Sequence, residues 1–372
     1  MDLKKTILVI ISILIFSHIL SSAGQAENDK LKYNFSIDAR SYFSNDQRIQ
    51  WSGAEATFGA EAIFNGSLTK FIGNSEVFAV GEFRLNQSFD NNILIDEFRE
   101  KYIQNFETDN FQIAQIFIGF QSKNFEVSLG KKNSVFGNDQ LLHLTNGEIF
   151  QPFIRTESIL WWETGLTLKY HSGIIRLALS IVNGGPEKDT NSSKAAVARA
   201  GIELNNFTLG ISAKMQDGIG SEWQKQYKNH IGVDLSFRSG KFAISAEGIY
   251  DEYGFRKEFD SDDIFWERSL YYRDQFYKTE TPITGVGGYI DILYKNEKFI
   301  FNLNYGEFHP EEINDPYHDT PIRRGIVKFI YNFSKEFNFF IGALIENNRI
   351  RESVFSGAKG YAYIAGLHFT LN

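Results

Sequence analysis

The sequence predicts an all-β fold, a 16-stranded antiparallel transmembrane β-barrel with short periplasmic turns and long extracellular loops. Three observations lead to this prediction. Apolar and polar residues alternate with a period of two along most of the chain. The segments that connect the alternating runs are short in one case and long in the next, along the whole chain. The N-terminus has the composition of an export signal.

Residues 1–26 are expected to form a secretory signal peptide, which leaves 27–372 as a single transmembrane β-barrel. Two lysines precede an apolar run of 14 residues, and small residues follow, so that cleavage is expected after Ala26 or Ala23. The alternative is a membrane-anchoring helix, which needs about 20 apolar residues. The run is too short for that alternative.

Charge and cysteine content exclude two classes of protein. The chain has a formal net charge of −8, and removal of the expected signal, which carries +1, leaves about −9. This charge disfavours nucleic acid as a partner. The chain has no cysteine, so it is not a small exported domain held together by disulfides. Aromatic residues make up 15% and charged residues 23%, a mixture that suits separate apolar and polar surfaces.

Sixteen runs of alternating residues are expected to form the strands. Each is roughly 9–15 residues long, enough for a tilted strand to cross a bilayer. All six prolines lie between the runs, as expected because proline cannot donate a hydrogen bond to a strand ladder. In chain order the runs are 31–43, 53–66, 75–88, 111–121, 124–132, 161–171, 174–184, 194–204, 206–216, 227–238, 241–251, 283–294, 298–308, 322–333, 336–347 and 359–371.

The fourth and fifth runs show how the two faces are assigned. Residues such as Ile118 and Leu129 alternate with Gln115, Ser128 and other mostly polar residues. Because lipid cannot satisfy backbone polar groups, strands span a membrane only as a closed barrel. The apolar face then meets lipid, and the polar face lines a lumen. A soluble β-sandwich would also alternate, but the export signal and the separation of short from long loops disfavour it.

The connections alternate in length. An even number of strands returns the C-terminus to the side of the N-terminus, which is the side of the short turns. The short connections include 122–124, 171–173, 205, 239–240, 295–297 and 334–336, and the long ones include 89–110, 133–160, 185–193, 217–226, 252–282, 309–321 and 348–358.

Charged residues on the polar face have nearly balanced signs, so they indicate neither a strong anion nor a strong cation preference. Arg176 with Glu163, and Arg199 with Glu203, are expected to neutralise one another across strands. The basic candidates are Arg40, Arg84, Lys132, Lys169, Arg176, Arg199, Lys214, Arg238, Arg324 and Lys328. The acidic candidates are Asp38, Glu55, Glu61, Glu82, Glu126, Glu163, Glu203, Asp234, Glu247, Asp251, Asp291 and Glu346.

Residues 110–137 resemble a pattern of Gram-negative porins, in which an inward Gln-aromatic-Gly strand turns into Val-x-Leu-Gly-Arg and Pro-Phe-Gly. Segments 161–218 and 231–250 are similar in kind and order to the phosphate-selective porin O and P family. The residues that carry the pattern are Gln115, Phe117, Gly119, Val127, Leu129, Gly130, Lys131, Phe136 and Gly137.

The resemblance implies a 16-stranded barrel in outer-membrane lipid, inserted by the barrel-assembly machinery and assembled as a homotrimer. It also implies that the third long loop, 133–160, folds inward and narrows the pore. The sequence departs from the family where Val135 replaces proline, Lys131 replaces arginine and Asn372 replaces a terminal aromatic residue. The loop also lacks a basic cluster, since it carries Arg155 against Asp139, Glu148 and Glu157.

The leading hypothesis is a porin of the bacterial outer membrane, without enzymatic activity or cofactor, that passes small hydrophilic solutes or ions. The candidate pore-lining and constriction residues are Lys131, Lys132, Asp139, Glu148, Arg155, Glu157, Arg84, Glu163, Lys169, Arg176, Arg199 and Lys214.

Three alternatives stay open at the level of sequence. An anion- or phosphate-selective channel would depend on Lys131, Lys132, Arg155, Arg176 and Arg199. An outer-membrane enzyme would need a nucleophile with a base, or paired carboxylates, and none of the histidines lies in a recognisable motif of that kind. A structural barrel would have no open pore. Residues 309–319 contain two histidines and four carboxylates, which are ligands for a divalent ion, although a solvated loop is the simpler interpretation.

Overall fold

The structure is a computed structural model, and its described residues form sixteen strands that close into one antiparallel barrel. The predicted fold class is therefore confirmed. The described residues are 31–46, 57–88, 111–137, 162–183, 194–216, 226–255, 283–310, 321–347 and 360–371. The strands are β1 (Leu31–Asp46), β2 (Thr57–Ile72), β3 (Ser75–Ser88), β4 (Phe111–Gln121), β5 (Phe125–Asn133), β6 (Trp162–Ser172), β7 (Ile175–Val182), β8 (Ala195–Leu204), β9 (Phe207–Met215), β10 (Gln226–Ser239), β11 (Phe242–Phe255), β12 (Ile283–Lys295), β13 (Phe299–Pro310), β14 (Ile322–Asn332), β15 (Phe337–Asn347) and β16 (Tyr361–Leu371).

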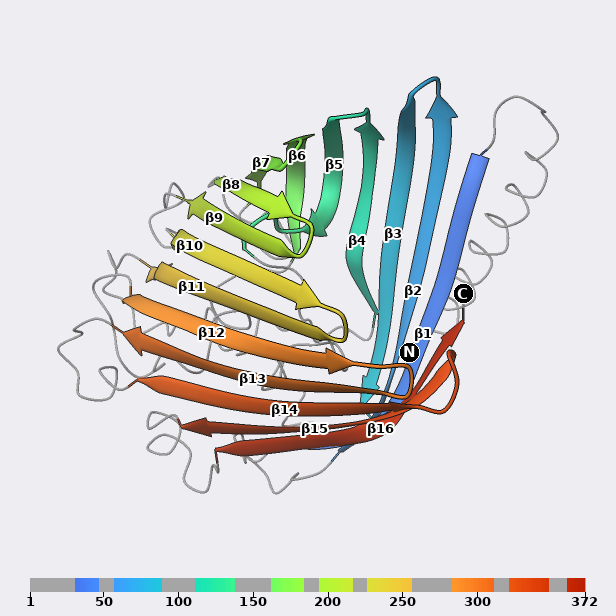
Figure 1. The fold of residues 1–372 in the computed structure, drawn as a ribbon, viewed down its shortest axis with the longest axis vertical. Helices are drawn as coiled ribbons and strands as arrows, with labels where there is room; N and C mark the ends of the chain where they lie inside the picture. The colour runs from blue at the N-terminus through green and yellow to red at the C-terminus, as the bar shows by residue number, and fades with distance from the viewer. Residues whose placement is uncertain are drawn as a thin grey trace, which may run out of the picture.

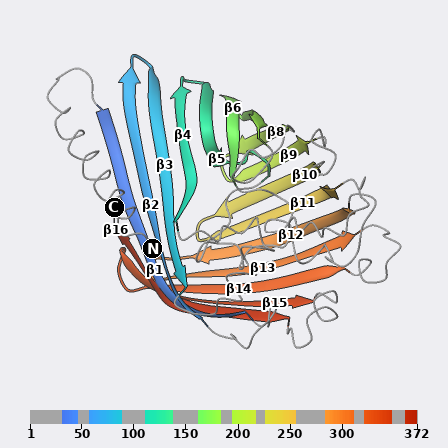
Figure 2. The ribbon, with the colours of Figure 1, turned by 180° about the vertical axis from the view of Figure 1, so that it is seen from behind.

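Every strand pairs with its neighbours in chain order, and β1 pairs with β16 to close the wall (Figure 1). The closing register runs from Ile37 opposite Leu371 to Asp46 opposite Ala362. The view from behind shows the same succession of strands around the wall (Figure 2). Closure satisfies the backbone groups of both edge strands, which an open sheet would leave unpaired.

The turns at one end of the barrel are tight. Gly73, Gly173 and Gly240 have φ angles of 61°, 55° and 58° in the β2–β3, β6–β7 and β10–β11 turns. Glycine adopts this left-handed conformation without the penalty that a Cβ imposes. In the β4–β5 turn the Ser122 N–H donates to the Phe125 carbonyl at 2.8 Å. The other ends of the strands, where the long connections begin, are at the opposite end of the barrel, in agreement with the predicted separation of short from long connections.

The ends of some strands differ from the prediction. β1 continues to Asp46, and β2 covers 57–72 where the sequence indicated 53–66. Gly73 and Asn74 supply the β2–β3 turn, so pairing with β3 continues up to Ile72 opposite Ser75. Pro310 was expected in a loop, and it is instead the last residue of β13.

The outer face of the barrel is apolar. In the hairpin of β4 and β5 the side chains of Ile116, Ile118 and Leu129 are 51%, 61% and 56% exposed. These residues are neighbours across the strand ladder, since Ile118 lies opposite Leu129. The alternation predicted from sequence thus puts the apolar residues outside. No helix among the described ranges is long and apolar enough to cross a membrane.

Aromatic rings gather on the outer face near the short turns. The ring centroids of Phe242 and Tyr294 are 4.8 Å apart, and those of Tyr294 and Phe299 are 5.5 Å apart. Phe333 stacks on Phe337 at 5.4 Å beside the β14–β15 turn. Aromatic residues at this level are typical of the girdles that flank the apolar band of membrane barrels.

The inner face is not uniformly polar, although the sequence indicated a mostly polar face lining the lumen. Strands β14 to β16 contribute a buried apolar cluster to this face, adjacent to Tyr42 and Ile300. Its members alternate along the strands with outward residues and share their side with Arg324 and Lys328. The cluster consists of Ile326, Ile330, Phe340, Leu344, Ala362 and Ile364.

Candidate functional site

The candidate functional site is the inward face of the barrel wall. Residues two apart on a strand share a face, and the ladder carries that face from strand to strand. Arg40 lies opposite Glu61 on the neighbouring strand, and Lys132 lies opposite Glu163. All four side chains therefore point to the side opposite the exposed apolar residues. Eight of the ten predicted basic residues contact a carboxylate from the same or a nearby strand.

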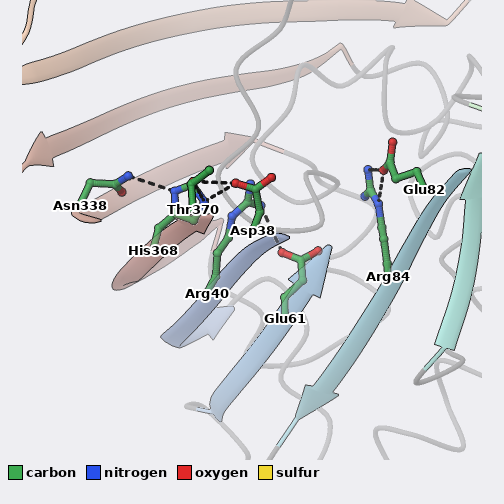
Figure 3. Close-up of polar contacts among 8 residues, drawn as sticks. All are labelled: Asp38, Arg40, Glu61, Glu82, Arg84, Asn338, His368 and Thr370. Atoms are coloured by element: carbon green, nitrogen blue, oxygen red, sulfur yellow. Dashed lines mark hydrogen bonds and ion pairs between the residues drawn. The ribbon is translucent and has the colours of Figure 1, made fainter. Parts of the chain in front are cut away.

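His368 links β15, β16 and β1 where the barrel closes (Figure 3). Its Nδ1 lies 3.0 Å from Asn338 Nδ2, and its Nε2 lies 3.0 Å from Asp38 Oδ1. The Thr370 hydroxyl donates to the same Asp38 oxygen at 2.8 Å. These side-chain bonds add to the backbone pairing between the first and last strands.

Two arginines near this closure each contact a glutamate (Figure 3). Arg40 Nη1 lies 3.2 Å from Glu61 Oε2, between β1 and β2. Arg84 donates to Glu82 Oε1 from Nε at 2.8 Å and from Nη2 at 2.6 Å. The Gln115 amide donates to the other Glu82 oxygen at 2.8 Å. The charge of Arg84, a predicted pore-lining residue, is thus neutralised by a carboxylate two residues earlier on its own strand.

On β5 and β6, the predicted lumen residues Lys132 and Lys169 share one carboxylate. Their Nζ atoms lie 3.4 Å and 3.5 Å from the same oxygen of Glu126. Lys132 also donates to the Ser128 hydroxyl at 2.7 Å and lies 5.2 Å from the centroid of the Phe117 ring. The side chain of Lys169 is 44% exposed. Two cations around one carboxylate give this part of the wall a local excess of positive charge.

A buried ion pair connects β6 to β9. Glu163 Oε1 and Lys214 Nζ are 2.5 Å apart, and each side chain is 2% exposed. The two intervening strands place Val182 and Val197 on the same face, and both are buried. Their short apolar side chains leave room for the two long side chains to meet. The expectation that Glu163 pairs with Arg176 is therefore wrong.

Arg176 and Arg199 also face inward, but with other partners than predicted. Arg176 Nε lies 2.7 Å from Glu203 Oε2, and Arg199 Nη2 lies 2.6 Å from Asp234 Oδ1. The predicted Arg199–Glu203 pair is wrong, since Arg199 reaches past β9 to β10. Gly210 on β9 makes this possible, because a Cβ there would lie 2.4 Å from Arg199 Nη2.

The wall from β11 to β15 carries polar groups that are closed off from solvent. The Tyr289 hydroxyl donates to Glu247 Oε2 at 2.9 Å, on β12 and β11. Arg324 Nη2 lies 2.7 Å from Glu346 Oε2, and both side chains are 1% exposed. On β6, by contrast, the inward side chain of Lys169 is 44% exposed. Water therefore reaches Lys169 more readily than the buried charged side chains Glu247, Asp291, Arg324, Lys328 and Glu346.

The chain leaves the wall after β5 and reaches β9 and β10. Phe136 is 1% exposed, and its ring lies 6.0 Å from the His230 ring in an edge-to-face arrangement. The Gly137 N–H donates to Ser212 Oγ at 3.0 Å. The Phe136 ring also lies against Gly232, where a Cβ would be 2.9 Å from the Phe136 Cζ. Three strands separate β5 from β9 in the wall, so these contacts are made on the lumen side.

One predicted pore residue does not face the lumen. Lys131 lies opposite Ile116 on β4 and Thr164 on β6, and Ile116 is exposed on the outer face. A step of one residue along a strand changes the face, so Lys131 points outward while Lys132 points inward. The predicted residues Asp139, Glu148, Arg155 and Glu157 lie outside the described residues.

The segment 309–319, considered as a divalent-ion site, is described only at its start. His309 Nε2 lies 2.8 Å from Glu307 Oε2, and Arg323 Nε lies 3.2 Å from the other oxygen of Glu307. Glu307 and Arg323 are paired on the outer face, near the long-loop end. In the part of the chain that the structure describes, no group of three or more His, Asp or Glu side chains is arranged to hold a metal ion.

The fold and the charged inner face define a porin-like closed β-barrel. Several solved structures share it. An anion-selective porin from Comamonas acidovorans matches with a TM-score of 0.61 and 10% identity, over 92% of this chain and 100% of that one. OmpF of Salmonella typhi, solved with daunomycin, matches with a TM-score of 0.66 and 9% identity, over 91% of this chain and 98% of that one. OmpT, an outer membrane protein of Vibrio cholerae, matches with a TM-score of 0.57 and 10% identity, over 93% of this chain and 99% of that one.

No protein-family model and no curated protein sequence matches the chain. At 9–10% identity the structural likeness establishes the fold alone. The resemblance to porins is thus supported at the level of the barrel, whereas membership of the phosphate-selective family is not confirmed.

Proposed function

We propose that this protein is a porin of the bacterial outer membrane that lets small hydrophilic solutes or ions diffuse passively. The observation that carries the proposal is the closed barrel of sixteen strands, with apolar side chains outside and charged side chains inside. A closed barrel is the form in which strands span lipid. The solved structures that share this fold include proteins described as porins.

The loop 133–160 is proposed to narrow the pore. Its described start supports this, because Phe136 and Gly137 contact β9 and β10 on the lumen side. A loop that begins in the lumen reduces the cross-section available to solutes. Asp139, Glu148, Arg155 and Glu157 would then add their charges to the narrow zone, opposite the cations of β1 to β6.

Selectivity between anions and cations is proposed to be weak. Arg40, Arg84, Arg176 and Arg199 each lie within 3.2 Å of a carboxylate. A paired charge contributes little net field to a pore, whereas selective pores present rings of one sign. The channel is therefore expected to discriminate mainly by solute size.

A modest anion preference is the second candidate, and one observation favours it. Lys132 and Lys169 lie around the single carboxylate of Glu126, with Lys169 partly exposed. Phosphate selectivity has less support, because Lys131 faces outward and Arg176 and Arg199 are paired.

An enzymatic role has little geometric support. Thr370, His368 and Asp38 are close enough to suggest a hydrolase triad, with Thr370 Oγ1 3.3 Å from His368 Nε2. In a triad the acid binds the ring nitrogen opposite the nucleophile. Here Asp38 and Thr370 both lie at Nε2, and Nδ1 contacts Asn338. This arrangement orients the ring without setting up a proton relay.

The assembled protein is proposed to be a homotrimer in outer-membrane lipid, exported by residues 1–26 and inserted by the barrel-assembly machinery. One related solved structure, OmpT of Vibrio cholerae, is described in a trimer form. The exposed apolar outer wall provides the surface that lipid or a neighbouring subunit would cover.

Liposome swelling tests the proposed function. Vesicles containing the folded protein are placed in isotonic solutions of sugars of increasing mass. Small sugars should enter rapidly and larger ones slowly, with a defined size limit, while vesicles with heat-denatured protein should not swell. Folded and inserted protein that admits no sugar of any size would favour the structural barrel without an open pore.

A further inference from the structure

We propose that the inner wall of β3 to β6 carries a weak binding subsite for small aromatic carboxylates. It is formed by the rings of Phe78 and Phe117, called here the aromatic corner, and by the ammonium groups of Lys132 and Lys169. This inference rests on the proposed channel function and names a class of solute for which the lumen would have affinity. All four residues belong to described strands.

Phe78 and Phe117 are apolar side chains that face the lumen and stay partly exposed there. Phe117 alternates on β4 with Ile116 and Ile118, which are exposed on the outer face, so its ring points inward. Phe78 on β3 lies opposite Gly119, which is on the same inward face of β4 as Phe117.

Other inward phenylalanine rings are enclosed instead. Their exposed fractions are 0–1%, for Phe136, Phe308 and Phe340. Unlike these three rings, the aromatic corner presents an apolar surface to the lumen. A planar apolar group in a solute would cover that surface and remove it from water.

The two rings of the corner are perpendicular. Their centroids are 6.1 Å apart and their planes are inclined at 89°. A Cβ at position 119 would lie nearest Phe78 Cζ and 2.8 Å from both Cε atoms, so it is a face of the Phe78 ring that covers Gly119. The opposite face of Phe78 is directed away from the wall, with the Phe117 ring beside it. An aromatic solute could therefore stack on one ring and meet the other edge-to-face.

Two cations border the corner and determine the charge of the solute. Lys132 Nζ lies 5.2 Å from the centroid of the Phe117 ring. Lys132 and Lys169 share the single carboxylate of Glu126, so one positive charge is in excess. Lys132 is 7% exposed and donates to Ser128, whereas Lys169 is 44% exposed. Lys169 is therefore the group that a solute carboxylate would contact, and Lys132 adds to the local potential.

This combination favours an aromatic anion over either of its parts. An inorganic anion would be attracted by Lys169 but would leave the corner uncovered. A neutral aromatic compound would cover the corner without using the excess charge. A small aromatic carboxylate such as benzoate uses both surfaces, and because each contact is weak it would leave readily, as conduction requires.

Benzoate is the probe for planar bilayers, with acetate matching its charge and benzyl alcohol matching its ring. At constant ionic strength, benzoate should reduce the chloride current at concentrations about three- to tenfold lower than either compound, since it gains an aromatic contact. Phe78→Leu and Phe117→Leu should each remove most of this difference, and leucine keeps the positions apolar. The matched control is Phe120→Leu, because Phe120 is exposed on the outer face of β4.

Lys169→Gln tests the cationic part of the subsite. It should weaken the effects of benzoate and acetate about two- to fivefold and leave that of benzyl alcohol unchanged. The control is Lys241→Gln, in the exposed β10–β11 turn. Benzyl alcohol that acts as strongly as benzoate in the wild type would overturn the assignment to carboxylates.

A second readout does not depend on conduction. Saturation-transfer difference NMR detects weak binding of benzoate to the protein in detergent. The signal of its ring protons should fall about threefold in the Phe78→Leu/Phe117→Leu double variant and stay unchanged in Phe120→Leu. Because Phe120 faces the detergent, this control also reports benzoate that has entered the micelle.

The outcomes separate the two proposals. A wild-type protein that does not conduct refutes the channel, and the NMR comparison then decides the subsite. If the wild type conducts and benzoate acts no more strongly than acetate, the subsite is refuted and the channel stands. An NMR signal that is equal in the double variant and the wild type also refutes the subsite, because benzoate would then bind elsewhere.

Discussion

Individual carboxylates organise the charges of the inner wall, and Glu126 shows this most clearly. It is the shared partner of Lys132 and Lys169, so its removal changes the local charge without removing any cation. Other cations have a carboxylate of their own, as Arg176 has Glu203 and Arg199 has Asp234. The balance of the lumen therefore depends on single acidic residues.

Glu126→Gln should shift the channel toward anions. The substitution leaves Lys132 and Lys169 without their common counter-charge, so the ratio of chloride to potassium permeability should rise about two- to threefold. Reversal potentials in a salt gradient measure this ratio. The matched control is Glu336→Gln, in the β14–β15 turn, where Glu336 accepts a hydrogen bond from Ser334. An unchanged ratio in Glu126→Gln would mean that this cluster does not face the conducting path.

Lys214→Ala should destabilise the barrel strongly. It leaves the buried Glu163 carboxylate without its counter-charge, which costs about 3–5 kcal/mol for a buried pair. Urea titration of folding into vesicles measures the change. Arg176→Ala is the control, because its pair with Glu203 is half exposed and should contribute at most about 1 kcal/mol. Equal losses in the two variants would contradict the buried character of the Glu163–Lys214 pair.

Sequence reasoning identified the face of most of these residues but not their partners. Parity along a strand assigns the side of Glu163, yet its partner depends on how far a long side chain reaches over small neighbours such as Val197. Alternation correctly placed Lys132 inward, and the error over Lys131 came from taking a residue of the porin pattern as a pore residue without applying the alternation. Phe136 and Gly137 belong to the porin pattern in the sequence, but the contact of Phe136 with Gly232 has no local signal, since it joins residues almost one hundred positions apart.

At the level of strands, the alternation of apolar and polar residues predicted most of the fold correctly. The hairpin of β4 and β5 has its predicted turn and its predicted outer face. The ends of β1 and β2 were less predictable, because polar residues such as Ser67 and Thr69 continue the ladder toward Gly73. Composition alone does not separate a polar strand end from a loop.

Ile118→Arg tests whether the outer face meets lipid. Ile118 is in the middle part of β4 and 61% exposed, so a charge there should cost about 2–4 kcal/mol of folding into vesicles. Thr164→Arg, on the same face near the long-loop end and opposite Lys131, should cost at most about 1 kcal/mol. If both substitutions lower the free energy of unfolding by the same amount in urea titrations, the proposal that Ile118 lies deeper in the bilayer than Thr164 would be wrong.

For the molecule as a whole, closure and asymmetry are the two main features. Pairing of β1 with β16 makes the wall continuous, and the bonds of His368 reinforce it from inside. The partly exposed Lys169 lies on β6, and the buried apolar cluster of β14 to β16 lies on another part of the inner wall. The even number of strands was predictable from loop lengths, whereas this division of the inner wall was not, because alternation does not distinguish inward apolar residues from outward ones.

The most direct test of the account is single-channel recording of the purified mature protein in a planar bilayer. The account predicts stepwise insertion events with an ohmic conductance and weak ion selectivity, because the barrel is closed and its lumen charges are largely paired. Protein that is folded and inserted by independent criteria, yet conducts no current at any voltage, would contradict it.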